Sequence, residues 1–459
     1  MTKCILTFTR TLALSAVFGT YIMSTLFLKK ITIKILMKNI PIYIAFTIIL
    51  LGGCTARQVT DSPIHIIDFG EAIDSMEEIM LSKYVSALKY TPIETCYTGL
   101  LGNIGSRCAI TDSLMFFASG DMLKCIHIFS SDGKYIKDIG AKGRGPNEYL
   151  GIRTMTYIPQ MDALMVEGGF DILFYSLKDG NCIKKCNLND YFDSSNDITT
   201  FFKGIKNISH NLSTRCVLLY NDTLYATAGE NTTLDQYLIK LDRNFSVDTI
   251  LSMRRTTLGL GMPKVEVSNV YQYNDNIYIL HGLQDTVYRL KNNSLLPHIA
   301  FNYGNMLSIS TMPQIQKTHP IFSPNTRHLS TKVAQIIASS NNIFAETDSF
   351  VIGTLFLPKD IAKSKGLERG TIYFVYDKNT ESTKLIKQSY SQEVSGFTND
   401  VDGGMPFWPS KQIGNKLYQF VDAGTFIDMS EKYNSARMKE IAATLTEESN
   451  PVIIEATLK

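Results

Sequence analysis

Two short segments of the sequence carry residue types that could bind a ligand. The first is Gly143-Arg144-Gly145-Pro146, which is followed by Glu148 and Tyr149. Glycine-rich loops can hold phosphate, but this segment lacks the GxxxxGKS/T spacing of a P-loop, and no helix is expected after it. We therefore expect the glycines to supply unusual backbone dihedrals at a turn, with Arg144 and Glu148 paired across it. Ligand binding by Arg144, Glu148 and Tyr149 is the alternative.

The second segment is Asp400-Val401-Asp402-Gly403-Gly404, which lies shortly before Trp408. Alternating carboxylates beside a glycine turn suit a hard cation such as calcium. The spacing fits an EF-type loop poorly, because Thr398 would occupy its first ligand position and no glutamate closes it. A polar loop is the preferred interpretation, calcium is the alternative, and no other cofactor is predicted. Trp408 either stacks on a sugar or fills the core, and the core is favoured because aromatic side chains bury large areas.

Known catalytic signatures are absent, so no catalytic residue and no metal ligand are predicted. The sequence contains no HExxH, GxSxG or Cys–His pairing. Without a CxxC motif or a nearby histidine pair, the cysteines are expected to be free thiols. Cys182 and Cys186 would lie about 13 Å apart on one strand, beyond disulfide reach. The scattered histidines are His65, His127, His210, His281, His298, His319 and His328. The cysteines that follow the leader are Cys96, Cys108, Cys125, Cys182, Cys186 and Cys216.

The elements that would position these residues come from a repeat. A polar turn with an apolar strand after it occurs six times, at intervals of 50 to 73 residues. Hairpins with period-two alternation and Asp-Gly, Asn or Asn-Asn turns follow five of these strands. The pattern predicts an all-β, six-bladed β-propeller over residues 64–459, with paired β-sandwiches or an irregular β-helix as alternatives. The six units start at Thr111, Met161, Asn221, Asn274, Thr347 and Gly414.

The sixth unit lacks its hairpin, so the two ends of the chain are expected to complete it. The C-terminal strand after Pro451 would pair with an N-terminal strand around residues 64–69 or 85–92. This pairing would close the ring and remove exposed sheet edges. One C-terminal helix is predicted over residues 430–445, with Ser430 as its N-cap.

The N-terminal segment reads as an export signal. Residues 37–53 contain a lysine, an apolar run and small residues, and Leu51-Gly52-Gly53-Cys54 resembles a bacterial lipobox. We predict a lipoprotein signal peptide over 37–53, lipidation at Cys54 and a tether over 54–63. Residues 1–36 are an upstream extension or an extra apolar segment. Six of the 45 basic residues precede Cys54, which leaves 39 against 43 acidic residues, so nucleic acid is not an expected partner.

Three segments of the chain resemble one known family. IGAKGRGPNEYLG from Ile139 resembles a signature of the six-bladed β-propeller lipoproteins of gut Bacteroidetes. NDVDGGMPFWP from Asn399 and the tail ESNPVIIEATLK are similar to further segments of that family. The resemblance covers the mature chain and implies the fold, but it implies little about activity.

The sequence therefore favours a non-catalytic binding or scaffolding lipoprotein. Its partner would be a glycan, a peptide or another envelope component, reached through loops at one face of the ring. The lipid would place it in the outer membrane, and the tether lacks the acidic cluster that resembles a surface-export signal, which favours the periplasmic face. The alternative is a metal-dependent hydrolase or lactonase with a cation in the central channel. Its ligands would come from the repeated positions Asp112, Asp222, Asp275 and Asp348.

Overall fold

The computed structural model describes residues 63–102, 104, 107–118, 125–168, 171–187, 212–220, 223–230, 236–241, 247–254, 268–281, 285–308, 338–367, 370–387 and 395–459. Within these ranges the chain is an all-β propeller with few helices, which confirms the prediction of an all-β propeller. Residues 64–459 form one compact unit. The predicted signal peptide and Cys54 lie outside the described residues. None of the described helices is both long enough and apolar enough to cross a membrane.

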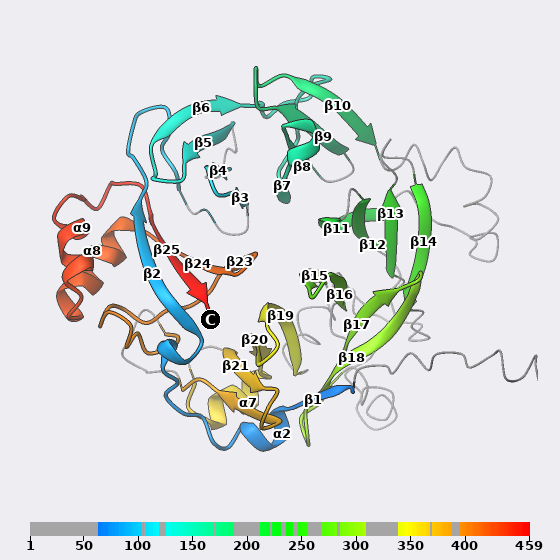
Figure 1. Ribbon diagram of the computed structural model, residues 1–459, viewed down its shortest axis with the longest axis vertical. Helices are drawn as coiled ribbons and strands as arrows, with labels where there is room; N and C mark the ends of the chain where they lie inside the picture. The colour runs from blue at the N-terminus through cyan, green and yellow to red at the C-terminus, as the bar shows by residue number, and fades with distance from the viewer. Residues whose placement is uncertain are drawn as a thin grey trace, which may run out of the picture. The chain divides into compact units, whose positions relative to one another are not determined.

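The strands form six sheets around a central axis, and the chain builds most of them from the innermost strand outward (Figure 1). The first sheet contains β3 (Cys108–Ile110), β4 (Leu114–Phe117), β5 (Ile126–Ser130) and β6 (Tyr135–Ile139). The second contains β7 (Thr154–Ile158), β8 (Ala163–Glu167), β9 (Asp171–Ser176) and β10 (Cys182–Asn187). The third contains β11 (Leu212–Tyr220), β12 (Thr223–Glu230), β13 (Gln236–Leu241) and β14 (Val247–Arg254).

The remaining three sheets complete the ring. The fourth contains β15 (Ser268–Tyr273), β16 (Asn276–His281), β17 (Thr286–Lys291) and β18 (Ser294–Asn302), with β1 (His65–Asp68) added. The fifth contains β19 (Ser339–Glu346), β20 (Phe350–Phe356), β21 (Thr371–Asp377) and β22 (Ser382–Leu385). The last contains β23 (Lys411–Ile413), β24 (Lys416–Val421), β25 (Val452–Leu458) and β2 (Val85–Pro92).

Five of these sheets are regular four-stranded blades, and the fourth departs from the predicted uniform pattern. In that sheet β1 pairs in parallel with the outer strand β18, with His65 opposite Ile299. The expectation of six equal four-stranded blades was therefore wrong in this sheet. The physical reason is that β18 would otherwise present a row of unpaired backbone groups, and β1 satisfies them.

The ring is closed by the two ends of the compact unit, as predicted. β25 lies between β24 and β2, with Tyr90 of β2 opposite Ile454 of β25. Of the two N-terminal candidates, residues 85–92 supply the closing strand, whereas the segment around β1 joins the fourth sheet instead. The last blade therefore combines strands from distant parts of the sequence.

The predicted single C-terminal helix is in fact two short helices, so that prediction was wrong. α8 (Ala423–Lys432) is capped by Asp422, and α9 (Ala436–Ala442) is capped by Ser435, which accepts a hydrogen bond from the Met438 N–H. Ser430 is buried inside α8 and caps nothing. The break arises because Tyr433 is extended and Asn434 N–H donates to the Gly403 carbonyl, 3.0 Å away. The other helical segments are α2 (Phe69–Ala72), α7 (Lys359–Ser364), and the 3₁₀ turns Leu81–Lys83 and Pro159–Met161.

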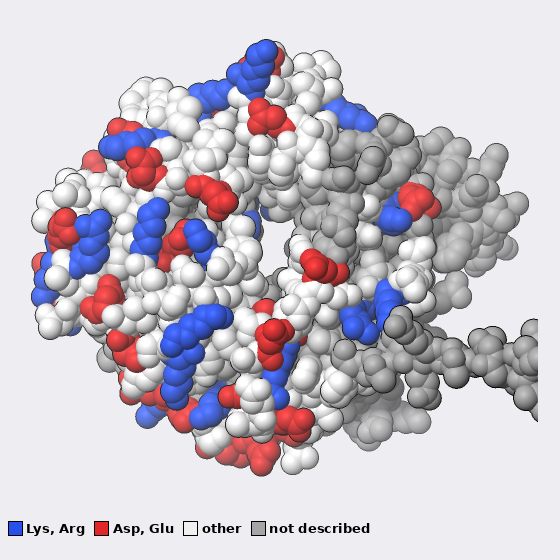
Figure 2. All heavy atoms as spheres, in the orientation of Figure 1, with Lys and Arg blue, Asp and Glu red and all other residues white. Residues whose placement is uncertain are grey.

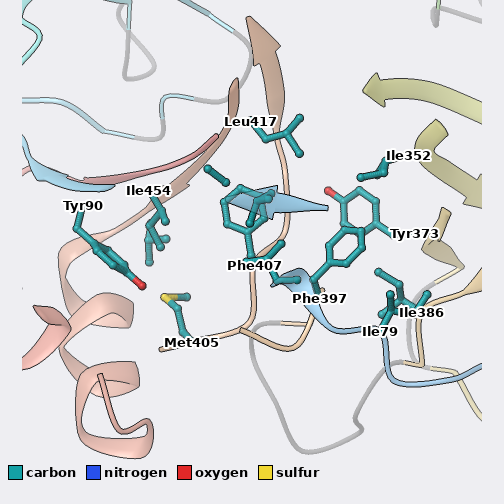
Figure 3. Close-up of a cluster of buried hydrophobic side chains, with 14 of the residues drawn as sticks. Ile79, Tyr90, Ile352, Tyr373, Ile386, Phe397, Met405, Phe407, Leu417 and Ile454 are labelled. Carbon is teal, nitrogen blue, oxygen red and sulfur yellow. The ribbon is translucent and has the colours of Figure 1, made fainter. Parts of the chain in front are cut away.

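The largest buried cluster lies where the fifth sheet meets the closing sheet. Figure 3 shows side chains from both sheets converging there, including Ile352, Tyr373, Leu417 and Ile454. Strands such as β21 are buried on both faces, because each blade is packed between two neighbours. The core therefore consists of layers between blades, and polar groups trapped in those layers must find partners.

Candidate functional site

Cys125, His127 and Asp138 form a compact polar group at one end of the β5–β6 hairpin. The His127 Nδ1 lies 2.7 Å from the Asp138 Oδ1. The Cys125 Sγ lies 3.9 Å from Nδ1 and 4.0 Å from Nε2 of the same ring. In the described ranges this is the one set of three or more His, Cys, Asp or Glu side chains that is compact enough to hold a metal ion.

Strand geometry explains why these three side chains meet. Cys125 and His127 are two residues apart, so their side chains point to the same face of β5. The Asp132-Gly133 turn sets the register of the hairpin, and His127 lies directly opposite Asp138 in β6. The sequence predicts no Cys–His pairing and no metal ligand. The first of these predictions is wrong, because the structure brings the Cys125 thiol next to the His127 ring. The i, i+2 spacing followed by a tight turn was the signal that could have revealed it.

Tyr149 from the predicted glycine-rich segment is a neighbour of this group. Its side chain is fully buried, and its ring packs edge-on against Tyr175. Burial raises the pKa of the Tyr149 hydroxyl well above its usual value, and negative charge on Cys125 and Asp138 raises it further. The Tyr149 hydroxyl therefore stays protonated and uncharged beside the cluster.

The rest of the glycine-rich segment is a self-contained turn. The Glu148 carboxylate accepts a hydrogen bond of 2.7 Å from the Gly145 N–H, and a Cβ at Gly143 would lie 1.9 Å from Glu148 Oε2. Arg144 is exposed and makes no ion pair with Glu148 in the described part of the chain. The expected Arg144–Glu148 pair was wrong, because the backbone N–H of the turn already binds the carboxylate.

The two aspartates of the second segment bind the protein itself. Asp402 accepts hydrogen bonds from Tyr90, Asn399, the Gly404 N–H and Ser435, at 2.8–3.2 Å. The Asp402 carboxylate thus joins the closing strand β2 to the start of α9. This arrangement matches the polar-loop interpretation.

Asp400 is held in the same manner at a neighbouring point. Its carboxylate accepts from both the N–H and the hydroxyl of Ser82, at 2.8 and 2.5 Å. Partial burial raises the pKa of Asp400, but the hydrogen bonds from Ser82 outweigh this and the net pKa is lowered. Trp408 is half-buried and packs against the large core cluster, beside Tyr373. This position agrees with the interpretation that Trp408 fills the core.

A second polar cluster lies between the fourth and fifth sheets, and none of its residues was predicted from the sequence as a site residue. Glu346 at the end of β19 is fully buried and binds Lys378 Nζ at 2.8 Å, His298 Nε2 at 2.6 Å and the Tyr271 hydroxyl at 2.6 Å. The Lys378 ammonium also donates to the Thr347 carbonyl. Burial raises the pKa of Glu346, but His298 and Lys378 more than compensate, and the net pKa lies below its usual 4.5. No local motif marks this cluster, since its members are far apart in the sequence.

The aspartates that would have formed a channel cation site do not gather. Asp112 and Asp275 are exposed in turns between strands, and Asp348 accepts hydrogen bonds from Tyr273 and Asn274 at 2.6 and 2.8 Å. Asp222 lies outside the described residues. The described aspartates therefore lie at separate hairpin turns, as ordinary turn chemistry predicts.

None of the described cysteines forms a disulfide, as expected. These are Cys96, Cys108, Cys125, Cys182 and Cys186, whereas the side chain of Cys216 lies outside the described set. The Figure 2 view shows an opening through the ring, and on its described surface basic and acidic side chains are interspersed. That pattern gives no basic stripe for nucleic acid on this face.

These features define a β-propeller whose polar clusters lie beside and between its blades. Residues 64–457 match the family described as "Domain of unknown function (DUF4934)", and the chain belongs to this family. No curated protein is significantly similar in sequence.

Two solved structures from Bacteroides resemble the chain. A Bacteroides fragilis protein that is named as exported has a TM-score of 0.59 and 15% identity, covering 86% of this chain and 100% of that one. A member of the DUF4221 family from Bacteroides vulgatus has a TM-score of 0.41 and 10% identity, covering 84% and 99%. At 15% identity the first similarity shows the fold alone. The resemblance to Bacteroides propellers therefore holds at the level of the fold.

Proposed function

We propose that this chain is an exported, lipid-anchored propeller that acts as a non-catalytic binding or scaffolding module in the cell envelope. In this proposal the five-stranded sheet counts as the sixth blade, with β1 as an edge addition. Residues 37–53 direct export, Cys54 carries the lipid, residues 54–63 form the tether, and the outer membrane is the destination. The similarity in fold to an exported Bacteroides fragilis protein supports export.

One observation carries the binding role: the carboxylates of the two ligand-like segments, Glu148, Asp400 and Asp402, are engaged by groups of the protein itself. Glu148, Asp400 and Asp402 hold backbone and hydroxyl groups of their own chain. A hydrolytic site needs carboxylates that are aimed at a substrate and a water molecule. A scaffold whose carboxylates stabilise its loops is better suited to presenting a rigid rim for recognition.

The lipid anchor and the recognition role require separate tests. Detergent partition of the wild-type protein and of Cys54→Ser, expressed in a Bacteroides host, tests the anchor. The proposal expects the wild type in the detergent phase and the variant in the aqueous phase. Protease treatment of intact cells then tests the membrane face, and protection is expected for the periplasmic face.

Recognition is tested with purified full-length protein against defined envelope polysaccharides and peptides in calorimetry. Saturable binding to one class, without turnover, is the expected result. The same preparation is incubated with lactone, ester and glycoside substrates in the presence of divalent cations. Metal-dependent turnover would instead establish the hydrolase alternative.

A further inference from the structure

We propose that Cys125, His127 and Asp138 form a binding site for a divalent transition metal of the zinc class. The site goes beyond the binding role above, because it concerns the metal chemistry of the β5–β6 hairpin and not recognition at the rim. It rests on the distances among the three side chains and on the strand pairing that fixes them.

The donor set is one that zinc accepts. Thiolate sulfur, imidazole nitrogen and carboxylate oxygen are its three protein ligand types, and tetrahedral coordination is its usual geometry. From zinc bond lengths of about 2.0–2.3 Å, ligand atoms of a tetrahedral site lie about 3.3–3.6 Å apart. Here the Sγ–Nδ1 distance is 3.9 Å and the Nδ1–Oδ1 distance is 2.7 Å. The three atoms lie within 4.8 Å of one another, so side-chain movements of about 1 Å would bring them onto one ion.

The strand backbone holds two of the ligands in place. His127 is 8% exposed, with Ile126 and Ile128 buried on either side of it in β5. Asp138 is its direct cross-strand partner in β6, so the His–Asp contact is maintained by the hairpin register. Asp138 is one-third exposed and Cys125 is half-buried. An ion bound by all three would therefore retain an open position toward solvent, which water or a partner group could fill.

A nucleophilic triad explains the geometry less well. In such a triad Asp138 would hold one ring nitrogen of His127, and the thiol would approach the other one closely. The Sγ is instead almost equidistant from both nitrogens, at 3.9 and 4.0 Å. A simple His–Asp hydrogen bond involves only two of the three clustered side chains. A metal that replaces the proton between Nδ1 and Oδ1 gives a role to all three.

Cobalt(II) titration of purified, chelator-treated full-length protein under reducing conditions tests the site. A thiolate that binds cobalt gives a charge-transfer band in the near ultraviolet, and four-coordinate cobalt gives visible bands. We expect one equivalent of cobalt to produce both, and zinc to abolish them. Because thiol and imidazole must lose protons to bind, the affinity is expected to rise with pH.

The variants separate this site from adventitious metal binding. Cys125→Ser is expected to remove the charge-transfer band. Asp138→Asn removes a ligand, so it should weaken cobalt binding by at least the roughly 10- to 100-fold that loss of a residue supporting a ligand costs. Cys96→Ser is the matched control, since it removes another partly exposed thiol and should leave the spectrum unchanged. Circular dichroism and Tm establish that each variant is folded. Absence of the band in the wild type, its persistence in Cys125→Ser, or its equal loss in Cys96→Ser would overturn the proposal.

Discussion

Replacing Glu346 by glutamine tests whether the buried ionic cluster holds the fourth and fifth sheets together. The substitution keeps the size and one acceptor oxygen but removes the negative charge. Lys378, whose side chain is 6% exposed, would then lose its charged partner and keep neutral groups, among them the Thr347 carbonyl and the face of the Tyr273 ring, 4.3 Å from its Nζ. His298 would likewise lose a charged partner at 2.6 Å.

The magnitude follows from the burial of both charges. Removing one member of a buried ion pair leaves the other uncompensated, which destabilises a protein by about 3–5 kcal/mol. At roughly 2 °C of Tm per kcal/mol, the lower end for large domains, Glu346→Gln should lower Tm by about 6–10 °C. The double variant that adds Lys378→Met removes both charges, and it should recover much of the lost stability.

The assay is thermal unfolding at a fixed scan rate, because large proteins often unfold irreversibly. Glu77→Gln is the matched control, since Glu77 also pairs with a lysine, Lys384, but both side chains are more than 40% exposed. The control should lose less than about 1 kcal/mol. Equal Tm values for Glu346→Gln and Glu77→Gln would refute the reasoning, as would a double variant less stable than Glu346→Gln.

Three further perturbations have defined outcomes. Gly143→Ala should lower Tm, because its Cβ would displace the Glu148 carboxylate from its hydrogen bond with the Gly145 N–H, whereas Gly151→Ala has open space and should have little effect; equal losses would contradict this. Truncation before β25 should abolish the cooperative unfolding transition, because it removes the inner strand that pairs with both β24 and β2; a retained transition in calorimetry would count against closure. The free energy of unfolding should fall below about pH 6.5, since burial lowers the pKa of His65 and only the unfolded chain protonates readily there. It should fall again below pH 4.5, because there Glu346 takes up a proton in the unfolded chain while its lowered pKa keeps it ionised in the folded protein; a Tm that is constant from pH 7 to 4 would refute both steps.

Local signals were sufficient to predict the hairpins of the propeller. Period-two alternation depends only on neighbouring residues, and turns such as Asn274-Asp275 and Asn292-Asn293 have positive φ at both positions, as the sequence predicts for tight hairpins. Six such units imply a ring, because each sheet must bury both faces against others. The polar-loop interpretation of the Asp402 segment was likewise a local inference, because the spacing of this segment fits an EF-type loop poorly.

Long-range contacts decided which segment closes the ring and where the C-terminal helix breaks. Whether residues 64–69 or 85–92 close the ring depends on which edge each segment reaches, and both segments have strand-forming residues. The helix break at Tyr433 depends on a hydrogen bond from the Asn434 N–H to the Gly403 carbonyl. Gly403 lies outside the helical segment, so the sequence of that segment cannot predict the break.

The two polar clusters differ in how far they could be predicted from the sequence. The Cys125–His127–Asp138 group was within reach of local reasoning, because strand alternation and one turn bring it together. The partners of Glu346 come from strands of two sheets and lie 32 to 75 residues away in the sequence. A sequence alone determines which side chains point into a layer between blades. Only the packing of one blade against the next determines which charges meet there, because burial forces each of them to find a partner.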